Sequence, residues 1–335
     1  MSSILCINTG SSSVKFSLYH EEDEIFSGQF DNSGEIPFDD IFEALPNTPE
    51  IIAHRVVHGG EQYKEAVLID DAVIARLSDL TPLAPGHQPR ALAGIEAVRS
   101  RYPEIPQYAC FDTAFHREMP ELAQRYPLPR RVLDAGVRRY GFHGLSYESI
   151  LSELEGRISE RLIIAHLGNG CSLCALKNGR PVDTTMGFTP AGGVMMGRRP
   201  GDLDPGVILY LIREGKYSVE ELDQLVNRES GLLGVSGIDF DMRKLRAMAD
   251  TDENAAFAID LFCYQIRKAI GAFSAVLGGL DLMVFTGGIG ENSPGIRDQI
   301  MAGLEYLDCD TEVIPTCETL SMVRQVMRKS KSADE

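Results

Sequence analysis

Residues 4–18 read Ile-Leu-Cys-Ile-Asn-Thr-Gly-Ser-Ser-Ser-Val-Lys-Phe-Ser-Leu, and they carry the strongest structural signal in the chain. An apolar strand leads into a turn of small residues, and a second strand follows in which Val14, Phe16 and Leu18 alternate with polar residues. The backbone N–H groups of a Gly/Ser turn can converge on an anion, and Lys15 supplies a positive charge close by. The spacing of a Walker A loop is absent, and a strand follows where that loop would require a helix. The stretch therefore indicates a strand–turn–strand phosphate site, with an ordinary Ser-rich hairpin turn as the alternative.

The size and charge of the chain narrow its class. A length of 335 residues allows two domains of ordinary size, and 44% hydrophobic with 24% charged residues is a normal globular mixture. The formal net charge of −17 argues against nucleic acids and anionic membrane surfaces as partners. An acidic protein that handles anions must concentrate positive charge locally, through Arg, Lys or a metal ion.

The cysteines and the N-terminus predict a cytoplasmic location. The seven cysteines are scattered, and no basic segment precedes an apolar core at the N-terminus. No apolar run approaches the length of a membrane span. Cys171 and Cys174 have C-x-x-C spacing, but they lie in an alternating strand pattern without a second Cys/His pair nearby. We interpret them as buried strand thiols.

Residues 161–180 repeat the plan of the opening stretch. An apolar strand leads through a Gly/Asn/Ser turn into a second strand, and the Asn178-Gly179 pair predicts a hairpin into a third. Two such units indicate two related domains that face each other across a cleft, although two unrelated meanders would give the same pattern. A third loop, at residues 281–292, joins a buried strand to a Gly-rich turn, and a helix is expected from about Ser293-Pro294.

Other segments have apolar residues at helical spacing, namely residues 91–101, 209–213 and 255–277. The last of these is apolar over much of its circumference, so we expect it to be packed on both sides. The tail at residues 328–335 is charged and rich in small residues, so we expect it to be frayed.

Four loops could carry chemistry, because loops on a rigid scaffold concentrate functional residues. They contain Arg55, Asp112, His143 and the pair Arg198-Arg199, each beside glycine or aromatic residues. Each has a plain alternative. Arg55 could be a surface charge and Asp112 a helix N-cap, His143 could be a core imidazole, and the Arg pair could lie in a solvated loop.

Taken in order, these motifs and several others resemble the acetate and propionate kinase family over nearly the full length of the chain. The matching segments are residues 8–15, 54–60, 83–87, 111–116, 139–144, 166–170, 183–190, 199–205, 230–237 and 285–292. The resemblance implies an α/β fold with two duplicated actin-like (ribonuclease H-like) domains and a nucleotide cleft between them. Residues 1–112 with 319–335 would form the N-terminal domain, to which the C-terminal helix returns. Residues 113–318 would form the second domain, which carries most of the nucleotide site.

The resemblance also implies an activity, the reversible Mg²⁺-dependent transfer of the ATP γ-phosphoryl group to acetate, giving acetyl phosphate and ADP. Mn²⁺ could replace Mg²⁺, and a cytoplasmic homodimer is expected from the family. The implied catalytic residues are Asp112, His143 and Arg199, and the implied acyl-binding residues are Arg55, Val57, Gly86, Phe142 and Pro190. The implied nucleotide-binding residues are Ser11, Ser13, Lys15, His166, Leu167, Gly168, Asn169, Gly170, Asp241, Met242, Arg243, Gly288, Ile289, Gly290, Glu291 and Asn292. Asn8 and Glu318 would position Mg²⁺, partly through water.

Asp112 is usually treated as the catalytic acid/base of this family. The attacking carboxylate is already ionised at pH 7, so no proton has to be removed. We therefore favour a role for Asp112 in orienting Mg²⁺, Arg55 or the substrate. Phosphoryl transfer depends mainly on in-line positioning and charge neutralisation.

The chain departs from the family pattern at several positions. Gly86 stands where relatives have Leu, Gln88 replaces an Asn, and Ala191-Gly192 replaces a Leu-Glu pair. The region after Leu307 is also short. Gly86 is expected to widen the acyl pocket, so a kinase for propionate or another short-chain acyl group is an alternative. A catalytically weak, nucleotide-gated binding protein is the second alternative.

Overall fold

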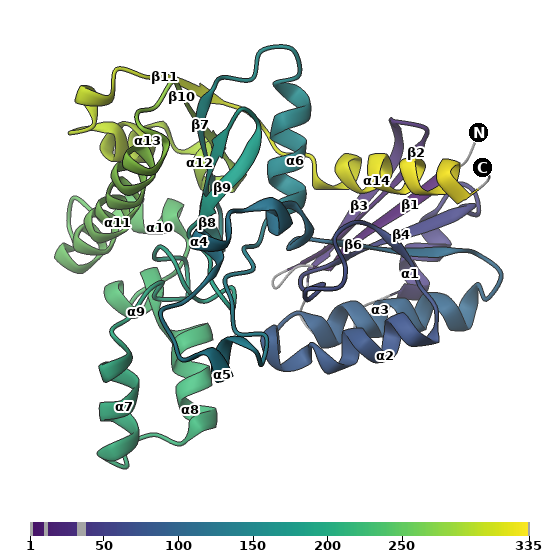
Figure 1. Ribbon diagram of the computed structural model, residues 1–335, viewed down its shortest axis with the longest axis horizontal. Helices are drawn as coiled ribbons and strands as arrows, with labels where there is room; N and C mark the ends of the chain where they lie inside the picture. The colour runs from purple at the N-terminus through teal and green to yellow at the C-terminus, as the bar shows by residue number, and fades with distance from the viewer. Residues whose placement is uncertain (1–2, 10–12, 32–37, 334–335) are drawn as a thin grey trace. The chain divides into compact units, whose positions relative to one another are not determined.

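The computed structural model describes residues 3–9, 13–31 and 38–333 of the chain (Figure 1). These residues form two compact units. Unit 1 is drawn from Met1–Arg117, Phe142–Ser152 and Cys317–Glu335, and unit 2 from Glu118–Gly141 and Glu153–Thr316. Each unit contains one β-sheet with helices packed on it, so the predicted α/β class is confirmed.

The opening stretch builds the centre of the sheet of unit 1. Strand β1 pairs antiparallel with β2 in an unbroken register from Ser3↔His20 to Thr9↔Val14, and it pairs parallel with β4 on its other side. The alternation predicted for β2 is only partly present. Val14, Phe16 and Leu18 are buried and Lys15 is exposed, but Ser17 is buried as well. The sheet order is β3-β2-β1-β4-β6-β5, with β1 at Ser3–Thr9, β2 at Ser13–His20, β3 at Asp23–Asp31, β4 at Ile51–Val56, β5 at Val67–Leu68 and β6 at Gln107–Phe111.

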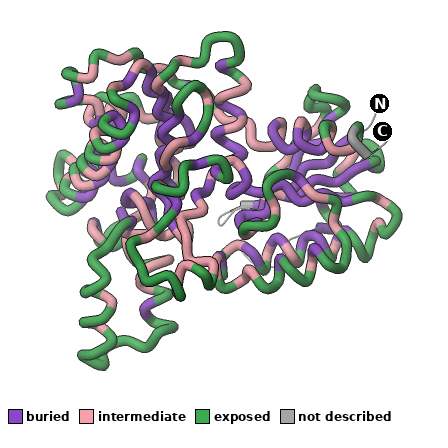
Figure 2. The backbone as a smooth tube through the Cα atoms, in the orientation of Figure 1, coloured by how far each residue is buried: buried purple, intermediate pink, exposed green. Residues whose placement is uncertain are grey.

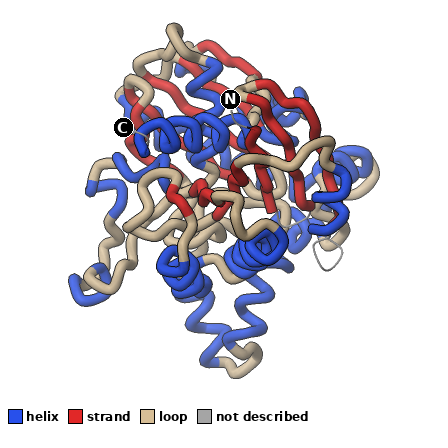
Figure 3. The backbone as a smooth tube through the Cα atoms, turned by 90° about the vertical axis from the view of Figure 1, so that its right-hand side faces the viewer, coloured by secondary structure: helices blue, strands red, loops and turns tan. Residues whose placement is uncertain are grey.

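Helices cover both faces of this sheet, which explains why β1 is apolar at consecutive positions. Ile4 and Cys6 pack beneath α14, whereas Leu5 and Ile7 belong to the opposite core with α1 and α3. Figures 1 and 3 show α14 lying across the strands. The helices are α1 (Phe38–Ala44), α2 (Asp71–Asp79), α3 (Gln88–Arg101), α6 (Gly144–Glu153) and α14 (Glu318–Ala333), with 3₁₀ turns at Thr81–Leu83 and Ala114–Glu118.

The predicted repeat is present in unit 2. Strands β7 and β8 pair antiparallel from Arg161↔Lys177 to Leu167↔Cys171, as β1 and β2 do. Asn178 (φ 50°) and Gly179 (φ 74°) then form the expected turn into β9. The sheet order is β11-β10-β7-β8-β9, with β7 at Arg161–Leu167, β8 at Cys171–Lys177, β9 at Arg180–Thr184, β10 at Leu282–Thr286 and β11 at Asp310–Val313.

The longest helix of unit 2, α11 (Glu253–Leu277), begins at an Asp252 N-cap and ends at Gly278 in the left-handed conformation. It packs against α9, α10, α13 and the sheet. The expectation that it is packed on both sides is only partly met, because Phe257, Tyr264 and Val276 are exposed. The other helices are α4 (Glu121–Gln124), α5 (Arg130–Leu133), α7 (Pro205–Arg213), α8 (Val219–Gln224), α9 (Gly231–Ser236), α10 (Met242–Met248), α12 (Gly287–Asn292) and α13 (Pro294–Met301), with a π turn at Leu225–Glu229 and a 3₁₀ turn at Glu305–Leu307.

Two local expectations are wrong. The tail at residues 328–333 is not frayed, because it continues α14, whose buried residues Val323 and Val326 hold the helix on the sheet. The Gly-rich turn after β10 is itself helical and forms α12, since the carboxylate of Glu291 accepts a hydrogen bond from the N–H of Gly287 at 2.9 Å.

Exposure differs sharply between elements of unit 2 (Figure 2). Strands β7 and β8 are almost entirely buried, whereas no residue of α7 is buried although that helix is rich in Val, Leu, Ile and Tyr. Among the described helices, none is both long enough and apolar enough to cross a membrane.

Candidate active site

Arg55 and Asp112 form the charged centre of unit 1. Strands β4 and β6 are parallel neighbours, so their carboxyl ends lie at the same edge of the sheet, and Arg55 and Asp112 occupy that edge. Arg55 donates from Nε to both carboxylate oxygens of Asp112, at 3.1 and 3.2 Å, and from Nη2 to Oδ2 at 2.7 Å. Their side chains are 13% and 1% exposed, so this is a largely desolvated bidentate pair.

Two residues from the ends of the chain complete this cluster. Asn8, near the end of β1, accepts from Arg55 Nη1 at 2.9 Å through Oδ1 and donates from Nδ2 to Glu318 Oε2 at 2.8 Å. Glu318 begins α14, and its Oε2 lies 3.7 Å from Arg55 Nη1. Lys15 is the cross-strand partner of Asn8, which places it beside the cluster. Residues that are more than 300 positions apart in the sequence are thus brought together here.

The oxygen atoms of this cluster fit a magnesium ion. Mg²⁺ is commonly held by one or two carboxylates, with water and substrate phosphates completing its octahedron. Asp112 and Glu318 supply two carboxylates, and Asn8 supplies an amide oxygen. The described residues contain no group of three or more His, Cys, Asp and Glu side chains suited to a metal ion, so water and substrate would have to supply the remaining ligands.

Electrostatics favour ionisation of the guanidinium at this site. Burial raises the pKa of Asp112, while the Arg55 charge and the backbone N–H of His143, which donates to the carboxylate, oppose that rise. Burial lowers the pKa of Arg55, but Asp112 and Glu318 more than offset this, so its pKa is raised and the guanidinium stays charged. His143 itself has a left-handed backbone with φ of 60°.

The residues expected to bind the acyl group are distributed over both units. Val57 and Phe142 in unit 1 are buried, and the ring of Phe142 meets that of His58 edge to face at 5.6 Å. Gly86 lies in the exposed turn before α3, and a Cβ atom built on it would have no neighbour within 4 Å. In unit 2, the carbonyl oxygen of Pro190 accepts from Arg199 Nη1 at 3.0 Å.

The loop that carries Arg199 is held by backbone contacts. The N–H of Met196 donates to the Arg199 carbonyl at 3.0 Å, and the N–H of Leu232 donates to the Met196 carbonyl at 2.9 Å. Gly231, with φ of 67°, packs so closely that a Cβ there would lie 2.2 Å from the Met196 carbonyl oxygen. Burial lowers the pKa of Arg199 to about 10, while the neighbouring Cys171 acts in the opposite direction. The guanidinium remains charged at pH 7 in a partly desolvated place, where it attracts anions strongly.

Three glycine-containing loops of unit 2 lie side by side. The N–H of Gly197 donates to the Asn169 carbonyl at 3.1 Å, which joins the Arg199 loop to the β7–β8 turn. A Cβ on Gly168 would lie 4.0 Å from the nitrogen of Gly288, which joins that turn to α12. Leu167 and His166 lead into the turn at the end of β7, and Gly170 closes it by accepting from Gly168 at 3.0 Å. The glycines of these loops have no side chain, so a ligand can approach the backbone closely there.

The side chain of Glu291 holds the backbone of this region in place. Its Oε1 accepts from the N–H groups of Gly287 and Thr316, at 2.9 and 3.3 Å, so it fixes the start of α12. Asn292 donates to the Gly288 carbonyl at 3.0 Å. Ile289 and Gly290 lie within α12.

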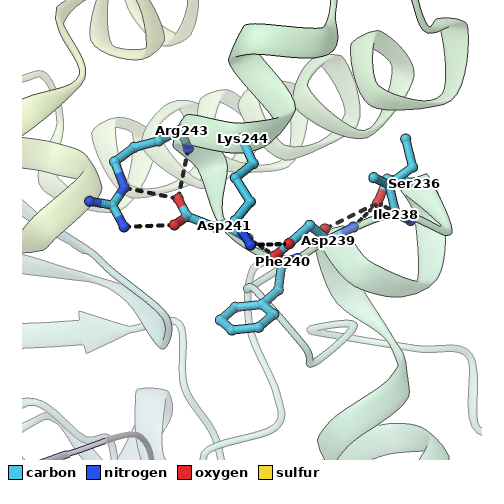
Figure 4. A network of polar contacts seen from close by, with 7 residues as sticks. All are labelled: Ser236, Ile238, Asp239, Phe240, Asp241, Arg243 and Lys244. Carbon is cyan, nitrogen blue, oxygen red and sulfur yellow. Dashed lines mark hydrogen bonds and ion pairs between the residues drawn. The ribbon is translucent and has the colours of Figure 1, made fainter. Parts of the chain in front are cut away.

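Asp241 and Arg243 are engaged with each other (Figure 4). Asp241 caps α10 by accepting from the N–H of Arg243 at 2.9 Å, and it also accepts from the Arg243 guanidinium at 3.1 and 2.7 Å. The guanidinium holds the pKa of Asp241 below its ordinary value. Met242, between them, is buried. This pair therefore fixes the start of α10.

Three features of these sites are not predicted by the sequence. Gly231 lies inside a matched segment, and only its positive φ and close packing reveal its role. The guanidinium of Arg198 lies over the ring of Phe240, with Cζ 4.0 Å from the ring centroid. No spacing rule predicts this contact. His116, in the Phe-Asp-Thr-Ala-Phe-His motif, binds the carbonyl of Phe142 at 2.9 Å. Of the remaining predicted residues, Ser11 lies outside the described residues, and Ser13 is described only through its backbone in β2.

Comparison with known proteins identifies similar chains. A family model described as the acetokinase family matches residues 38–332. The acetate kinase of Clostridium botulinum (strain Kyoto / Type A2) is 48% identical over 263 residues, which cover 76% of this chain and 66% of that protein. The acetate kinase of Methylocella silvestris is 48% identical over 274 residues, covering 80% of this chain and 67% of the relative. The matched part thus spans about two thirds of the length of these relatives.

Solved structures agree with the fold over nearly the whole chain. The acetate kinase of Porphyromonas gingivalis superposes with a TM-score of 0.87 at 33% identity, covering 98% of this chain and 99% of that one. A propionate kinase from Francisella tularensis gives 0.88 at 33% identity, with coverage of 97% and 99%. A putative N-acetylmannosamine kinase from Listeria monocytogenes, at 0.54 and 15% identity, shares the fold alone. The predicted two-domain fold class is confirmed.

Proposed function

Because the chain belongs to the acetokinase family, we propose that it transfers the γ-phosphoryl group of ATP reversibly to a short-chain carboxylate, acetate first among them. One carboxylate oxygen forms the new bond to phosphorus, the bond to the β-γ bridging oxygen breaks, and the products are an acyl phosphate and ADP. The observation that carries the proposal is the cluster of Arg55, Asp112, Asn8 and Glu318 at one sheet edge.

Arg55 is suited to hold the substrate carboxylate. Its bonds to Asp112 and Asn8 engage one N–H on each of Nε, Nη2 and Nη1. A guanidinium has about five N–H donors, so two remain after these contacts within the described part of the chain. A second carboxylate can use them while Asp112 fixes the plane of the fork.

The charges of the cluster suit a divalent cation. Asp112 and Glu318 oppose two negative charges to the one positive charge of Arg55, so a bound cation would help an anionic substrate to approach. Mg²⁺ bound there would supply positive charge against the phosphates. Asn8, Asp112 and Glu318 are the residues that would hold it. In this proposal Asp112 orients Arg55, to which it is hydrogen-bonded, and would help to hold the ion, with no proton to remove.

His143 and Arg199 are proposed to neutralise the charge that develops on the transferring group. Arg199 is held rigidly by its loop, so its charge needs little reorganisation when the phosphoryl group arrives. The loops at residues 168–170 and 287–292 are proposed to bind the phosphates of ATP through backbone N–H groups, with residues 241–243 on the adenosine side. Ser11, Ser13 and Lys15 are proposed to contact the phosphates from unit 1.

A hydroxamate trap tests this function. The purified protein is incubated with ATP, Mg²⁺, hydroxylamine and acetate, and acyl hydroxamate is measured by its iron complex. We expect product only when all components are present, and chelation of Mg²⁺ should abolish it. ATP binding without hydroxamate, for every carboxylate tried, would contradict the proposal and favour a nucleotide-gated binding protein.

A preference for propionate or a longer acyl chain is the second candidate, and Gly86 favours it. The family resemblance implies Leu at this position, whereas a Cβ on Gly86 would meet nothing within 4 Å. Running the same trap with acetate, propionate and butyrate distinguishes the two candidates, because a narrow pocket would give product with acetate alone.

We also propose that the protein is a homodimer that uses α7. This helix exposes Val207, Leu209, Tyr210 and Ile212 at 44%, 48%, 55% and 45%, and an apolar helix of this kind is normally buried. A second copy would cover it. Light scattering after size exclusion should give twice the chain mass, and replacing Leu209 and Tyr210 with Lys should give monomers. Leu122→Lys, at a single residue that is 95% exposed, is the control that should remain dimeric.

A cytoplasmic location is part of the proposal, and it is supported by thiol chemistry. All seven cysteines are free, and five of them are buried. Free buried thiols are typical of reducing compartments.

A further inference from the structure

We propose that His116 is a positioning residue, which fixes the peptide group between Phe142 and His143 and thereby orients both His143 and Asp112. The inference rests on the proposed function, because it concerns how two residues of that reaction are held. All the residues involved belong to unit 1.

The imidazole of His116 is locked in place. It lies in the 3₁₀ turn Ala114–Glu118 that follows β6, and it is 1% exposed. Its ring stands edge to face against the rings of Phe115 and Tyr147, with distances between ring centroids of 5.3 and 5.6 Å. A ring held on two sides in this way has little freedom to turn.

The position of its proton follows from its partner. Nε2 lies 2.9 Å from the carbonyl oxygen of Phe142, and a carbonyl can only accept, so Nε2 must carry the proton. Burial lowers the pKa of His116 to about 4, so the ring is neutral at pH 7 and Nδ1 is deprotonated. Nδ1 is buried and has no hydrogen-bond partner within the described part of the chain. Leaving Nδ1 unsatisfied in the interior costs free energy, and a phenylalanine of similar shape would avoid that cost. The hydrogen bond from Nε2 to the Phe142 carbonyl is what a phenylalanine could not supply.

The other side of the same peptide is held by Asp112. The backbone N–H of His143 donates to the Asp112 carboxylate, and the N–H of Gly144 donates to the Asp112 carbonyl at 2.9 Å. The C=O and N–H of a trans peptide point in opposite directions, so His116 and Asp112 hold this peptide from opposite sides. A Cβ on Gly144 would lie 2.2 Å from the Asp112 carbonyl oxygen, so glycine is required for this approach.

This double anchoring explains the backbone of His143. A φ of 60° is unusual for a residue with a side chain, and such a conformation persists only where its surroundings impose it. Without the bond from His116, the peptide can rotate and relieve the positive φ. His143 would then move, and the hydrogen bond from its N–H to Asp112 would weaken.

Two substitutions at His116 and one at a matched residue test the inference. His116→Phe keeps the packing and removes the donor, whereas the amide N–H of His116→Gln can reach the same carbonyl. His54→Phe is the control, because His54 is equally buried, its pKa is likewise lowered to about 4 by burial, and its Nε2 is hydrogen-bonded to Gln107 at 2.8 Å.

We expect His116→Phe to lower kcat by about 100-fold, the scale of a misplacement of about 1 Å, while the KM for ATP stays within about twofold. The kcat of His116→Gln should be about tenfold higher than that of His116→Phe, because part of the positioning is restored. His54→Phe should lower the melting temperature and leave kcat nearly unchanged. A His116→Phe enzyme with normal kcat, or an equal loss of kcat in His54→Phe, would overturn the inference.

A second measurement does not depend on activity. Hydrogen exchange at the His143 amide should be at least about tenfold faster in His116→Phe, and it should be unchanged in His54→Phe. Equal exchange in wild type and His116→Phe would overturn the inference. If the wild type makes no acyl hydroxamate, the proposed function fails, and the exchange measurement still decides the role of His116.

Discussion

Arg55 shows how one residue acquires its chemistry from its neighbours. A surface arginine would bind a carboxylate weakly, because water screens the pair. Arg55 is only 13% exposed, its plane is fixed by three hydrogen bonds to Asp112, and Asn8 orients its far nitrogen. A guanidinium that is already oriented loses little entropy when a further anion binds.

Arg199 gives the first prediction at this scale. Arg199→Ala should lower kcat by about a thousandfold, because a charge that stabilises the transferring phosphoryl group is lost. Circular dichroism and the melting temperature should change little, since the loop is held by its backbone. Arg198→Ala, which removes a partner of Phe240, is the matched control and should retain most activity. An Arg199→Ala enzyme with near-normal kcat would exclude Arg199 from the mechanism.

The second prediction at the residue scale concerns Gly86 and the choice of acyl substrate. Gly86→Leu should favour acetate over propionate by about tenfold or more relative to wild type, since one methylene is worth about 1–3 kcal/mol in a hydrophobic pocket. The new side chain meets open space, so the fold should tolerate it. The ratios of kcat/KM for acetate, propionate and butyrate measure the effect in both proteins. Identical ratios before and after the substitution would place Gly86 outside the acyl pocket.

At the scale of elements, α9 is what sets the loop of Arg199. Gly231 and Gly237 lie at its two ends with nearly equal φ, 67° and 66°, but a Cβ on Gly231 would collide with Met196 and Arg199 while one on Gly237 would meet nothing within 4 Å. Substituting each glycine by alanine therefore distinguishes two costs. Both variants bear the cost of a left-handed backbone, but only the Gly231 variant adds the cost of a steric clash.

We expect Gly237→Ala to cost about 1 kcal/mol, the ordinary penalty for a left-handed residue. Gly231→Ala should cost more than about 3 kcal/mol, because a backbone clash is added to the same penalty. It should also lower kcat by about tenfold or more through displacement of Arg199. Urea unfolding and steady-state kinetics of the two variants measure both effects. Equal losses in both would mean that α9 does not constrain the loop.

The elements also show what sequence reasoning can reach. Apolar runs predicted β1 and β7 correctly, and the strands that follow each small-residue turn predicted β2 and β8, because these signals lie in a few consecutive residues. The contact of Asn8 with Glu318 joins the two ends of the chain, and only resemblance to a family suggested it. The helical continuation to Ala333 was missed, because its stability comes from packing on the sheet and not from the composition of the tail.

At the scale of the whole molecule, three buried histidines predict acid sensitivity. Burial lowers the pKa of His54, His58 and His116 from 6.5 to about 4. Between those values the unfolded chain binds more protons than the folded one, so stability is complete above about pH 6.5 and is lost as the pH falls toward 4. Each shift is worth roughly 3 kcal/mol, a large part of a typical total stability.

The melting temperature should therefore be nearly constant from about pH 7 to 8 and fall steeply from about pH 6.5 to 4.5. His54→Gln should reduce the steepness, because one titrating imidazole is gone. A melting temperature that is the same at about pH 7 and about pH 5 would contradict this account of the buried histidines.

The central claim is that a substrate carboxylate oxygen attacks the γ-phosphorus directly, and isotope transfer tests it most directly. The protein is given ATP, Mg²⁺ and acetate labelled with ¹⁸O in both oxygens, and the acyl phosphate is examined by ³¹P NMR. We predict an upfield isotope shift of the acyl phosphate signal, because the bridging oxygen comes from acetate. Release of unlabelled inorganic phosphate without any labelled acyl phosphate would contradict the claim.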